Sequence, residues 1–281
     1  MTARRKLLPP SRARRKRRVA RLKQVFFTLV LFSGVLAFFL FLFREPSLRV
    51  NAVELSGAEA VPAEEILGVV NESLAGAYFR LVPKESVFFY PKGAIEEELA
   101  ARFPRLARVE LSLENFRALR VEVIERAPAY LWCGSAREIV TSECFSLDET
   151  GYVFDRPAVF SGSSLARFYG ALAGEGDGAV GKRFLPENEF AELRRFLVAA
   201  EALGLAPSSL VKKGGQAGDY EISLKEGGTL LFTLDGGAEK PASNLESALD
   251  TDPLKKNMAA KRSALDYIDL RFGNKVFFKF R

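Results

Sequence analysis

The feature that most constrains this chain is an uncharged, apolar run over residues 25–43, in which seven positions are Phe. A helix of these nineteen residues spans about 28 Å, close to the roughly 30 Å hydrocarbon core of a bilayer. A secretory signal peptide is the alternative, but its apolar region usually has about 7–15 residues and ends in a small-residue cleavage site. Here the run ends in Arg44, Glu45 and Pro46 without such a site. The sequence therefore predicts an uncleaved membrane-spanning helix.

A strongly basic tail precedes this run. Residues 1–24 contain eleven Lys or Arg and no acid. The membrane-proximal basic residues are Arg14, Arg15, Lys16, Arg17 and Arg18. Because Lys and Arg beside a span stay on the cytoplasmic side, we expect the tail inside and the later residues outside. Each basic residue near an anionic surface contributes about 1 kcal/mol, which predicts contact with anionic lipid at the tail.

The net charge of +6 belongs to that tail. Removing its eleven basic residues from the 41 Lys and Arg leaves 30, against 35 Asp and Glu. The rest of the chain is therefore mildly acidic, which argues against a nucleic-acid-binding protein. The length of 281 residues suits one large domain or two modest ones.

The two cysteines, Cys133 and Cys144, both follow the span. An even number of Cys in an oxidising compartment permits a disulfide, and both lie at facing ends of two expected strands. Two small buried residues in a host that does not oxidise thiols are the alternative. Since the chain has no His and two Cys are too few ligands, we expect no metal site.

Apolar spacing predicts an α+β unit after the span, followed by a strand-rich domain with helices. In the first unit we expect a strand at 50–55, helices at 62–74 and 94–103, and strands at 109–113 and 119–123. In the second we expect helices at 187–203 and 240–249 and strands at 130–133, 139–147, 152–154, 210–212, 220–225, 229–234, 265–272 and 275–280. Alternating apolar residues are typical of half-buried antiparallel strands with helices on one face. Residues 78–90 are apolar and irregular, and the pattern assigns them no element.

No catalytic constellation is recognisable. The absence of His removes the commonest general base and the nucleophile pairs that depend on it. Asp148 and Glu149 fall at an expected turn. Asp266 and Asp269 are three apart in an expected strand and would face opposite sides. The sequence predicts neither an enzyme nor a cofactor.

The last expected strand is the strongest candidate for a binding surface. Its alternation places one set of side chains on one face, Val276, Phe278 and Phe280, and another set on the other, Lys275, Phe277, Lys279 and Arg281. A terminal strand is often a sheet edge, where unpaired N–H and C=O groups accept an extended partner. An equally good interpretation is that the basic residues blunt the edge against aggregation. Spacing alone leaves both open.

Four motifs in order resemble the FtsQ/DivIB family of cell-division proteins. They are Arg102-Phe103-Pro104 with residues 109–111, residues 119–128 leading to Trp132, the hairpin at 144–154, and residues 267–272 with 275–278. The order of basic tail, anchor and two outer domains agrees. The resemblance implies a cytoplasmic tail at 1–24, a transmembrane helix at 25–43, a POTRA domain (β-α-α-β-β) at 48–127, and a mixed, mostly antiparallel β domain with helices at 128–281.

The resemblance also implies a function. The chain is similar to non-enzymatic scaffolds of the bacterial divisome, which lie in the plasma (inner) membrane at the septum and help couple septum assembly to cell-wall synthesis. Such scaffolds hold FtsB- and FtsL-like bitopic partners by strand addition at the end of the sheet. This implies partner binding by Phe272, Lys275, Val276, Phe277, Phe278, Lys279 and Phe280, while Asp269 and Arg271 are expected to hold the sheet.

Two other function classes remain to be weighed. A POTRA-containing protein of outer-membrane or secreted-protein assembly or transport is the alternative function, although such proteins usually carry several POTRA repeats or a long β-barrel. An anchored cell-wall hydrolase would need a catalytic cluster within residues 129–281, and none is recognisable there.

Overall fold

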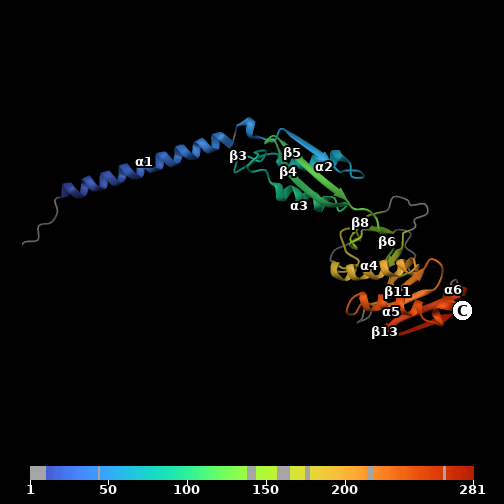
Figure 1. The fold of residues 1–281 in the computed structure, drawn as a ribbon. Helices are drawn as coiled ribbons and strands as arrows, with labels where there is room; N and C mark the ends of the chain where they lie inside the picture. The colour runs from blue at the N-terminus through green and yellow to red at the C-terminus, as the bar shows by residue number, and fades with distance from the viewer. Residues whose placement is uncertain are drawn as a thin grey trace, which may run out of the picture. The chain divides into compact units, whose positions relative to one another are not determined.

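A computed structural model describes residues 11–43, 45–137, 144–156, 165–174, 178–213, 218–261 and 264–281. The chain is mixed α+β, with an N-terminal apolar helix, a three-stranded sheet, a two-stranded hairpin and a nine-stranded mixed sheet (Figure 1). The described residues divide into two compact units. The second unit takes in residues 103–107 and the chain from 125 onward, and the first unit takes in the rest.

The N-terminal helix α1 (Ser11–Phe43) is long and apolar enough over Arg17–Phe39 to cross a membrane. None of that stretch is buried, which fits a single-pass membrane protein. The helix begins well before the expected span. Residues 11–24 include neither Gly nor Pro, and their many Arg and Lys residues are good helix formers. Arg17 and Arg18 are exposed on it. The side chains of Arg14, Arg15 and Lys16 lie outside the described part.

The first unit has the expected order of strand, helix, helix, strand, strand. Its elements are β1 (Ala52–Ser56), α2 (Ala63–Leu74), β2 (Ala77–Tyr78), β3 (Val82–Pro83), α3 (Lys92–Arg102), β4 (Leu106–Glu114) and β5 (Ala118–Glu125). The sheet order is β1-β5-β4. The expectation of antiparallel strands is wrong for β1, which runs parallel to β5. The helices α2 and α3 lie between these strands in the chain and provide the long connection that a parallel pair needs. The unassigned residues 78–90 contribute to the small β2–β3 hairpin.

Aliphatic side chains from the helices and strands form the core of this unit. The buried set is Ile66, Val69, Val70, Leu74, Ile95, Leu99, Leu111, Leu119, Val121 and Val123. Each fully buried side chain of this size contributes about 1.5–3 kcal/mol. Acids in the first turn of α2, Glu64 and Glu65, complement the helix dipole. Leu67 of the same helix is half-buried, whereas Val69 is buried.

The second unit is built on the nine-stranded sheet. Its elements are β6 (Tyr130–Trp132), β7 (Phe145–Leu147), β8 (Val153–Asp155), β9 (Arg167–Tyr169), α4 (Glu187–Ala202), β10 (Pro207–Lys212), β11 (Asp219–Leu224), β12 (Thr229–Thr233), α5 (Glu239–Asp250), α6 (Leu254–Lys261), β13 (Leu265–Phe272) and β14 (Lys275–Phe280). Their order in space is β14-β13-β12-β11-β10-β9-β6-β7-β8. The pairs β12–β13, β9–β10 and β6–β9 are parallel. The other pairs are antiparallel. The first part of the strand expected at 139–147 lies outside the described residues.

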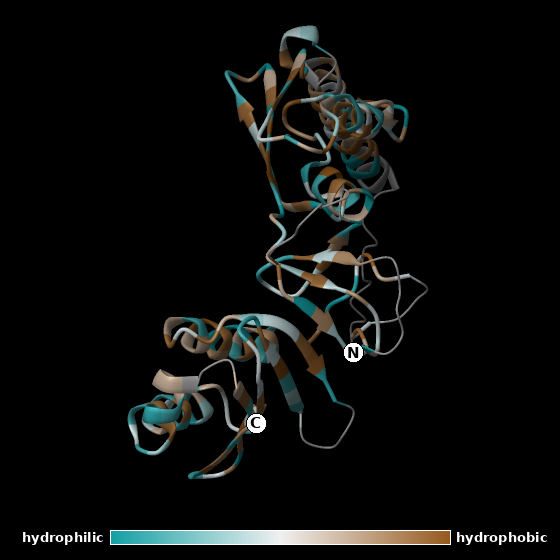
Figure 2. Ribbon diagram, turned by 90° about the vertical axis from the view of Figure 1, so that its right-hand side faces the viewer, coloured by the Kyte–Doolittle hydropathy of each residue, from teal (hydrophilic) through white to brown (hydrophobic). Residues whose placement is uncertain are grey.

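Helix α4 packs its predicted apolar stripe onto the sheet. The buried residues are Phe190, Leu193, Phe196, Leu197 and Ala200, and Figure 2 shows apolar bands alternating with polar ones along the neighbouring strands. The ring of Phe196 stacks on Phe232 of β12, with 4.0 Å between ring centroids. Gly204, with φ of 78°, ends the helix in a left-handed turn that favours glycine.

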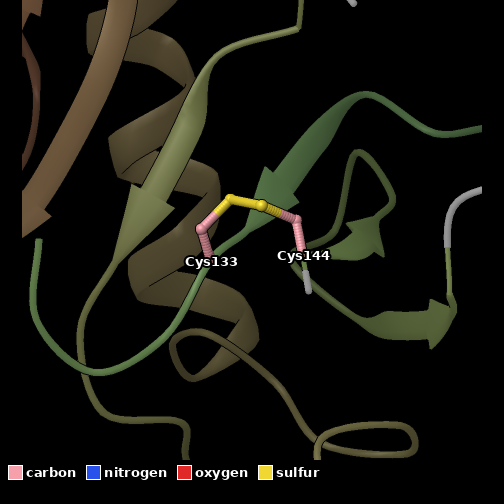
Figure 3. Close-up of a disulfide and its surroundings, with 2 residues drawn as sticks. All are labelled: Cys133 and Cys144. Carbon is pink, nitrogen blue, oxygen red and sulfur yellow. A yellow bond between two sulfur atoms is a disulfide. The ribbon is translucent and has the colours of Figure 1, made fainter. Parts of the chain in front are cut away.

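Cys133 and Cys144 form a disulfide (Figure 3). Cys133 directly follows β6 and Cys144 directly precedes β7. The pairing of Trp132 with Phe145 places the two cysteines side by side, with 4.2 Å between their Cα atoms. The structure therefore has the bridge and not two free thiols.

Candidate partner-binding edge

Strand β14 lies at one end of the nine-stranded sheet (Figure 1). It pairs antiparallel with β13, in a register that places Ile268 opposite Phe278 and Asp269 opposite Phe277. Within the part of the chain that the structure describes, no strand pairs with the far side of β14. Among the described residues, β14 is therefore an edge of this sheet.

The alternation of backbone groups along β14 determines which of them face the open side. The N–H of Arg281 donates to the carbonyl of Ala264, at 2.8 Å, so this residue points its backbone toward β13. In an antiparallel pair, alternate residues share this direction. Lys279 and Phe277 therefore turn their N–H and C=O groups toward β13. The backbone groups of the residues between them, Val276, Phe278 and Phe280, point to the open side.

The side chains of β14 alternate across the two faces of the sheet as the sequence predicts. Val276, Phe278 and Phe280 are half-buried and pack against the core of the second unit. Lys275, Phe277 and Lys279 are exposed. The residues that offer free backbone groups thus hold the strand on the sheet, and the exposed side chains stand beside the open edge.

Two exposed aromatic rings form a pair at the hairpin between β13 and β14. Phe272 is 55% exposed and Phe277 is 49% exposed. Their rings meet edge to face with centroids 5.1 Å apart. The amide of Asn244 on α5 donates to the carbonyl of Gly273 in the turn, at 2.6 Å. Because the turn is fixed from behind, the pair is a preorganised apolar contact at the edge.

Two basic side chains near the pair are balanced by one acid on β13. The ammonium of Lys279 lies 3.2 Å from the carboxylate of Asp266, and the guanidinium of Arg281 lies 3.7 Å from it. These contacts join two neighbouring strands and are exposed, so each contributes only about 0–1 kcal/mol. They join Lys279 and Arg281 to the neighbouring strand β13.

A buried carboxylate supports β13 just behind the edge. Asp269 is buried and accepts two hydrogen bonds from the guanidinium of Arg271, at 2.8 and 2.7 Å. Burial alone raises the pKa of the Asp269 carboxyl, but these bonds and one from the Arg271 backbone outweigh it and lower the pKa below its ordinary value. This geometry agrees with the expectation that Asp269 and Arg271 hold the sheet.

Strand β13 departs from regular alternation at two points. The register shifts between Leu265 and Tyr267 and again between Asp269 and Phe272. The first irregularity lets Leu265 and Ile268, three residues apart, both join the core. It also brings Asp266 to Lys279, on the face where Asp269 stands opposite Phe277. The expectation that Asp266 and Asp269 face opposite sides is therefore wrong, because it assumed an unbroken strand.

The adjacent acids Asp148 and Glu149 have structural contacts. The carboxylate of Asp148 accepts hydrogen bonds from the backbone of Thr150, at 2.8 Å, and of Tyr152, at 3.0 Å, and it pairs with the guanidinium of Arg126. Burial raises the pKa of Asp148, but these donors prevail and lower it below its ordinary value. Glu149 pairs with Arg194 at 2.7 Å. Within the described ranges, no three His, Cys, Asp or Glu side chains group closely enough to hold a metal ion.

Comparison of the chain with protein-family models found no match, and comparison with curated proteins found none either.

The sequence pattern pointed to the edge strand but not to the contacts that support it. Asn244 gave no signal because its contact crosses from α5 to a turn far along the chain. The irregularities of β13 gave none because a bulge has no side-chain pattern of its own.

Proposed function

We propose that this protein is a membrane-anchored scaffold of the bacterial division machinery, which captures an extended segment of an FtsB- or FtsL-like bitopic partner by strand addition at β14. The observation that carries the proposal is the open edge, where the backbone groups of Val276, Phe278 and Phe280 face away from β13. An extended peptide pairs with such groups through its main chain, and alternate side chains supply specificity.

The side chains around the edge support the same interaction. The Phe272–Phe277 pair offers exposed aromatic area next to the unpaired backbone. Buried aromatic anchors dominate the energy of many protein interfaces. The exposed Lys275 adds positive charge beside the edge, which suits a partner segment that carries acids.

The remaining support comes from the order of elements and from the resemblance. The first unit has a strand, two helices and two further strands in chain order, with sheet order β1-β5-β4, and this order supports the proposal of a POTRA-type domain. The apolar helix α1 suits a protein whose partners are themselves bitopic. On this proposal the first unit recruits the chain to the septum, and the second unit holds the partner without any catalytic step.

Substitutions at Val276 separate backbone pairing from side-chain contact. In Val276→Pro, the N–H that points to the open side is removed, while the ladder to β13 keeps its donors; proline is tolerated at such edge positions. In Val276→Ala, the half-buried side chain is removed and the N–H stays. The full-length chain and each variant are co-expressed with the tagged bitopic division proteins of the host and purified from detergent.

Strand addition predicts that Val276→Pro lowers capture about tenfold, which corresponds to the upper range for one lost hydrogen bond. It predicts a smaller change for Val276→Ala. Equal capture by the wild type and by Val276→Pro, with unchanged urea midpoints, would refute strand addition. Failure of every version to capture a division protein, together with binding of an unfolded outer-membrane protein, would favour the assembly and transport alternative.

A further inference from the structure

The first unit exposes a group of large apolar side chains in two of its turns. Within residues 77–90, Phe79 is 94% exposed, Phe88 is 55% exposed and Phe89 is 44% exposed. In the turn between β4 and β5, Phe116 is 66% exposed. Large apolar side chains that are exposed together on a domain often mark a binding surface.

Neither turn is of a type that favours Phe. Phe79 has a φ of 50° and Phe116 has a φ of 54°, in the left-handed region that Gly and Asn occupy most readily. A bulky residue there is uncommon and gains little from the fold when it is exposed. The two side chains are therefore better explained by a contact outside the folded unit than by packing within it.

Backbone hydrogen bonds tie both turns to the first residues after the apolar helix. The N–H of Val50 donates to Glu85 at 2.8 Å, and the N–H of Val87 donates to Leu48 at 3.1 Å. The N–H of Asn51 donates to Arg117, the neighbour of Phe116, at 2.8 Å. Residues 48–51 thus bond directly to residues 85 and 87 and to the neighbour of Phe116. The hairpin that carries Phe79 comes just before residue 85 in the chain and is closed by a bond from the N–H of Lys84 to the carbonyl of Gly76, at 3.0 Å.

Chain length then limits how far these turns can be from the membrane. From Phe43, the end of α1, to Leu48 the chain has five steps, which span at most about 18 Å when fully extended. Part of this connection is the 3-10 turn η1 (Pro46–Leu48), which is shorter than an extended chain. If α1 crosses a bilayer, residues 48–51 and the turns bonded to them stay close to its outer surface.

We propose that the two turns insert Phe79, Leu81, Phe88, Phe89 and Phe116 into the outer interface of the phospholipid bilayer that α1 spans. Apolar and aromatic side chains gain free energy at the boundary between headgroups and acyl chains. Arg80 and Lys84, beside the first turn, suit anionic headgroups. This contact seats the first unit on the membrane. It requires α1 to span the membrane, but it does not depend on partner capture by β14.

Spin labels on the full-length chain test this proposal. Both native cysteines are held in the disulfide, so one added Cys can be labelled selectively. Labels replace Phe79 (Phe79→Cys) or Phe116 (Phe116→Cys). Phe32→Cys, in α1, is the positive control. Ile124→Cys is the matched aqueous control, because Ile124 is also exposed, at 56%, but lies at the opposite end of β5. The chains are reconstituted into vesicles of phosphatidylcholine and phosphatidylglycerol.

Collision rates with oxygen and with a water-soluble nickel chelate then give the depth of each label. We expect the labels at 79 and 116 to lie about 5–10 Å within the interface, shallower than the label at 32, and the label at 124 to be aqueous. Aqueous labels at 79 and 116 would overturn the proposal, and so would protection from both reagents, which indicates a protein contact. An aqueous label at 32 would overturn its premise that α1 spans the bilayer.

Because a nitroxide label is itself apolar, a second comparison tests whether the native side chains of Phe79 and Phe116 cause the insertion. A label at Leu81→Cys is measured in the presence of both native Phe residues and again with Phe79→Ser and Phe116→Ser. The proposal predicts that the double substitution moves this label toward water, while Phe272→Ser, on the other unit, leaves its depth unchanged. An unchanged depth in the double variant would contradict insertion by these two side chains.

Discussion

The two edge strands of the nine-stranded sheet differ in whether another segment of the chain covers them. At one edge, β8 is covered by a neighbouring segment: the N–H of Val153 donates to Lys182, and the N–H of Gly181 donates to Val153, both at 2.8 Å. At the other edge, no strand among the described residues covers β14. Uncovered edges invite pairing with other chains, and proteins usually protect them. Among the described residues, this fold therefore covers one edge with its own chain and leaves the other edge, β14, available to another chain.

The supports of the two edges also differ. The covered edge is short and buries Val153 in the core. It is further held by ionic and covalent contacts: Asp155 of β8 pairs with Arg105 at 2.6 Å, and the disulfide joins the segments that flank β6 and β7. The open edge is longer and held by Phe278 and its apolar neighbours. Changes at the two edges should therefore have separable effects on stability and on binding.

The largest effect is expected for Phe278→Asp. Its half-buried ring packs on the core, and its replacement by a charge removes apolar burial and places a carboxylate there, at a cost of about 3 kcal/mol. Urea unfolding of the full chain, followed through the single Trp, Trp132, measures this loss. Phe278→Leu is the control and should retain most of the stability. A loss below about 1 kcal/mol would show that β14 is not held through this side chain.

Removal of the disulfide tests the covered edge. The bridge closes a loop between residues separated by 11 positions, and the chain-entropy relation gives about 2–3 kcal/mol for a loop of this length. We expect the double variant Cys133→Ser with Cys144→Ser to lose stability by that amount in the urea experiment. Partner capture by the folded double variant should be unchanged. A parallel loss of capture would mean that the two edges are coupled.

Phe277→Asp should separate binding from folding at the open edge. The side chain is exposed, so the free energy of unfolding should change by no more than about 0.5 kcal/mol. Loss of the aromatic pair with Phe272 should weaken partner binding by about 2 kcal/mol, as for an interface hot spot. Titration of the reconstituted chain with the partner measures the second value. Unaltered affinity would remove the pair from the binding site.

The smallest effect is expected from acid. Asp148, near the covered edge, and Asp269, near the open one, both have a pKa lowered from 3.8, because hydrogen bonds from neighbouring donors outweigh the burial that raises it. Each ionised carboxylate therefore stabilises the fold fully above pH 3.8 and loses that contribution as the pH falls through its lower folded-state pKa. Asp148→Asn and Asp269→Asn should each flatten the decline of stability below pH 4. A decline as steep as that of the wild type would show that the residue does not contribute.

Elements with strong periodicity could be predicted from the sequence, and elements defined by distant pairing could not. The apolar stripe of α4 and the alternation of β14 could be predicted because the apolar or polar character of each residue indicates whether its side chain is buried. Strand β9 and helix α6 were missed. The three residues of β9 pair with β6 and β10, which are far apart in the chain, and α6 has no marked apolar stripe.

The same distinction applies to the candidate site. Its strand and its exposed side chains followed from spacing. That the opposite edge is covered by residues near Lys182 did not, because this contact depends on a loop that folds back onto β8. The bonds from residues 48–51 to two apolar turns were likewise invisible, although the apolar character of residues 78–90 was the signal that pointed to them.

Residue-resolved amide hydrogen exchange on β14, with and without a captured bitopic partner, tests the open edge most directly. In the free protein we predict fast exchange at Val276, Phe278 and Phe280 and slower exchange at Phe277 and Lys279, whose N–H groups face β13. Partner binding should slow exchange at the first three by about tenfold or more, as expected when a main-chain hydrogen bond forms. Slow exchange at all five amides before the partner is added, or no slowing at Val276, Phe278 and Phe280 in the complex, would contradict strand addition at this edge.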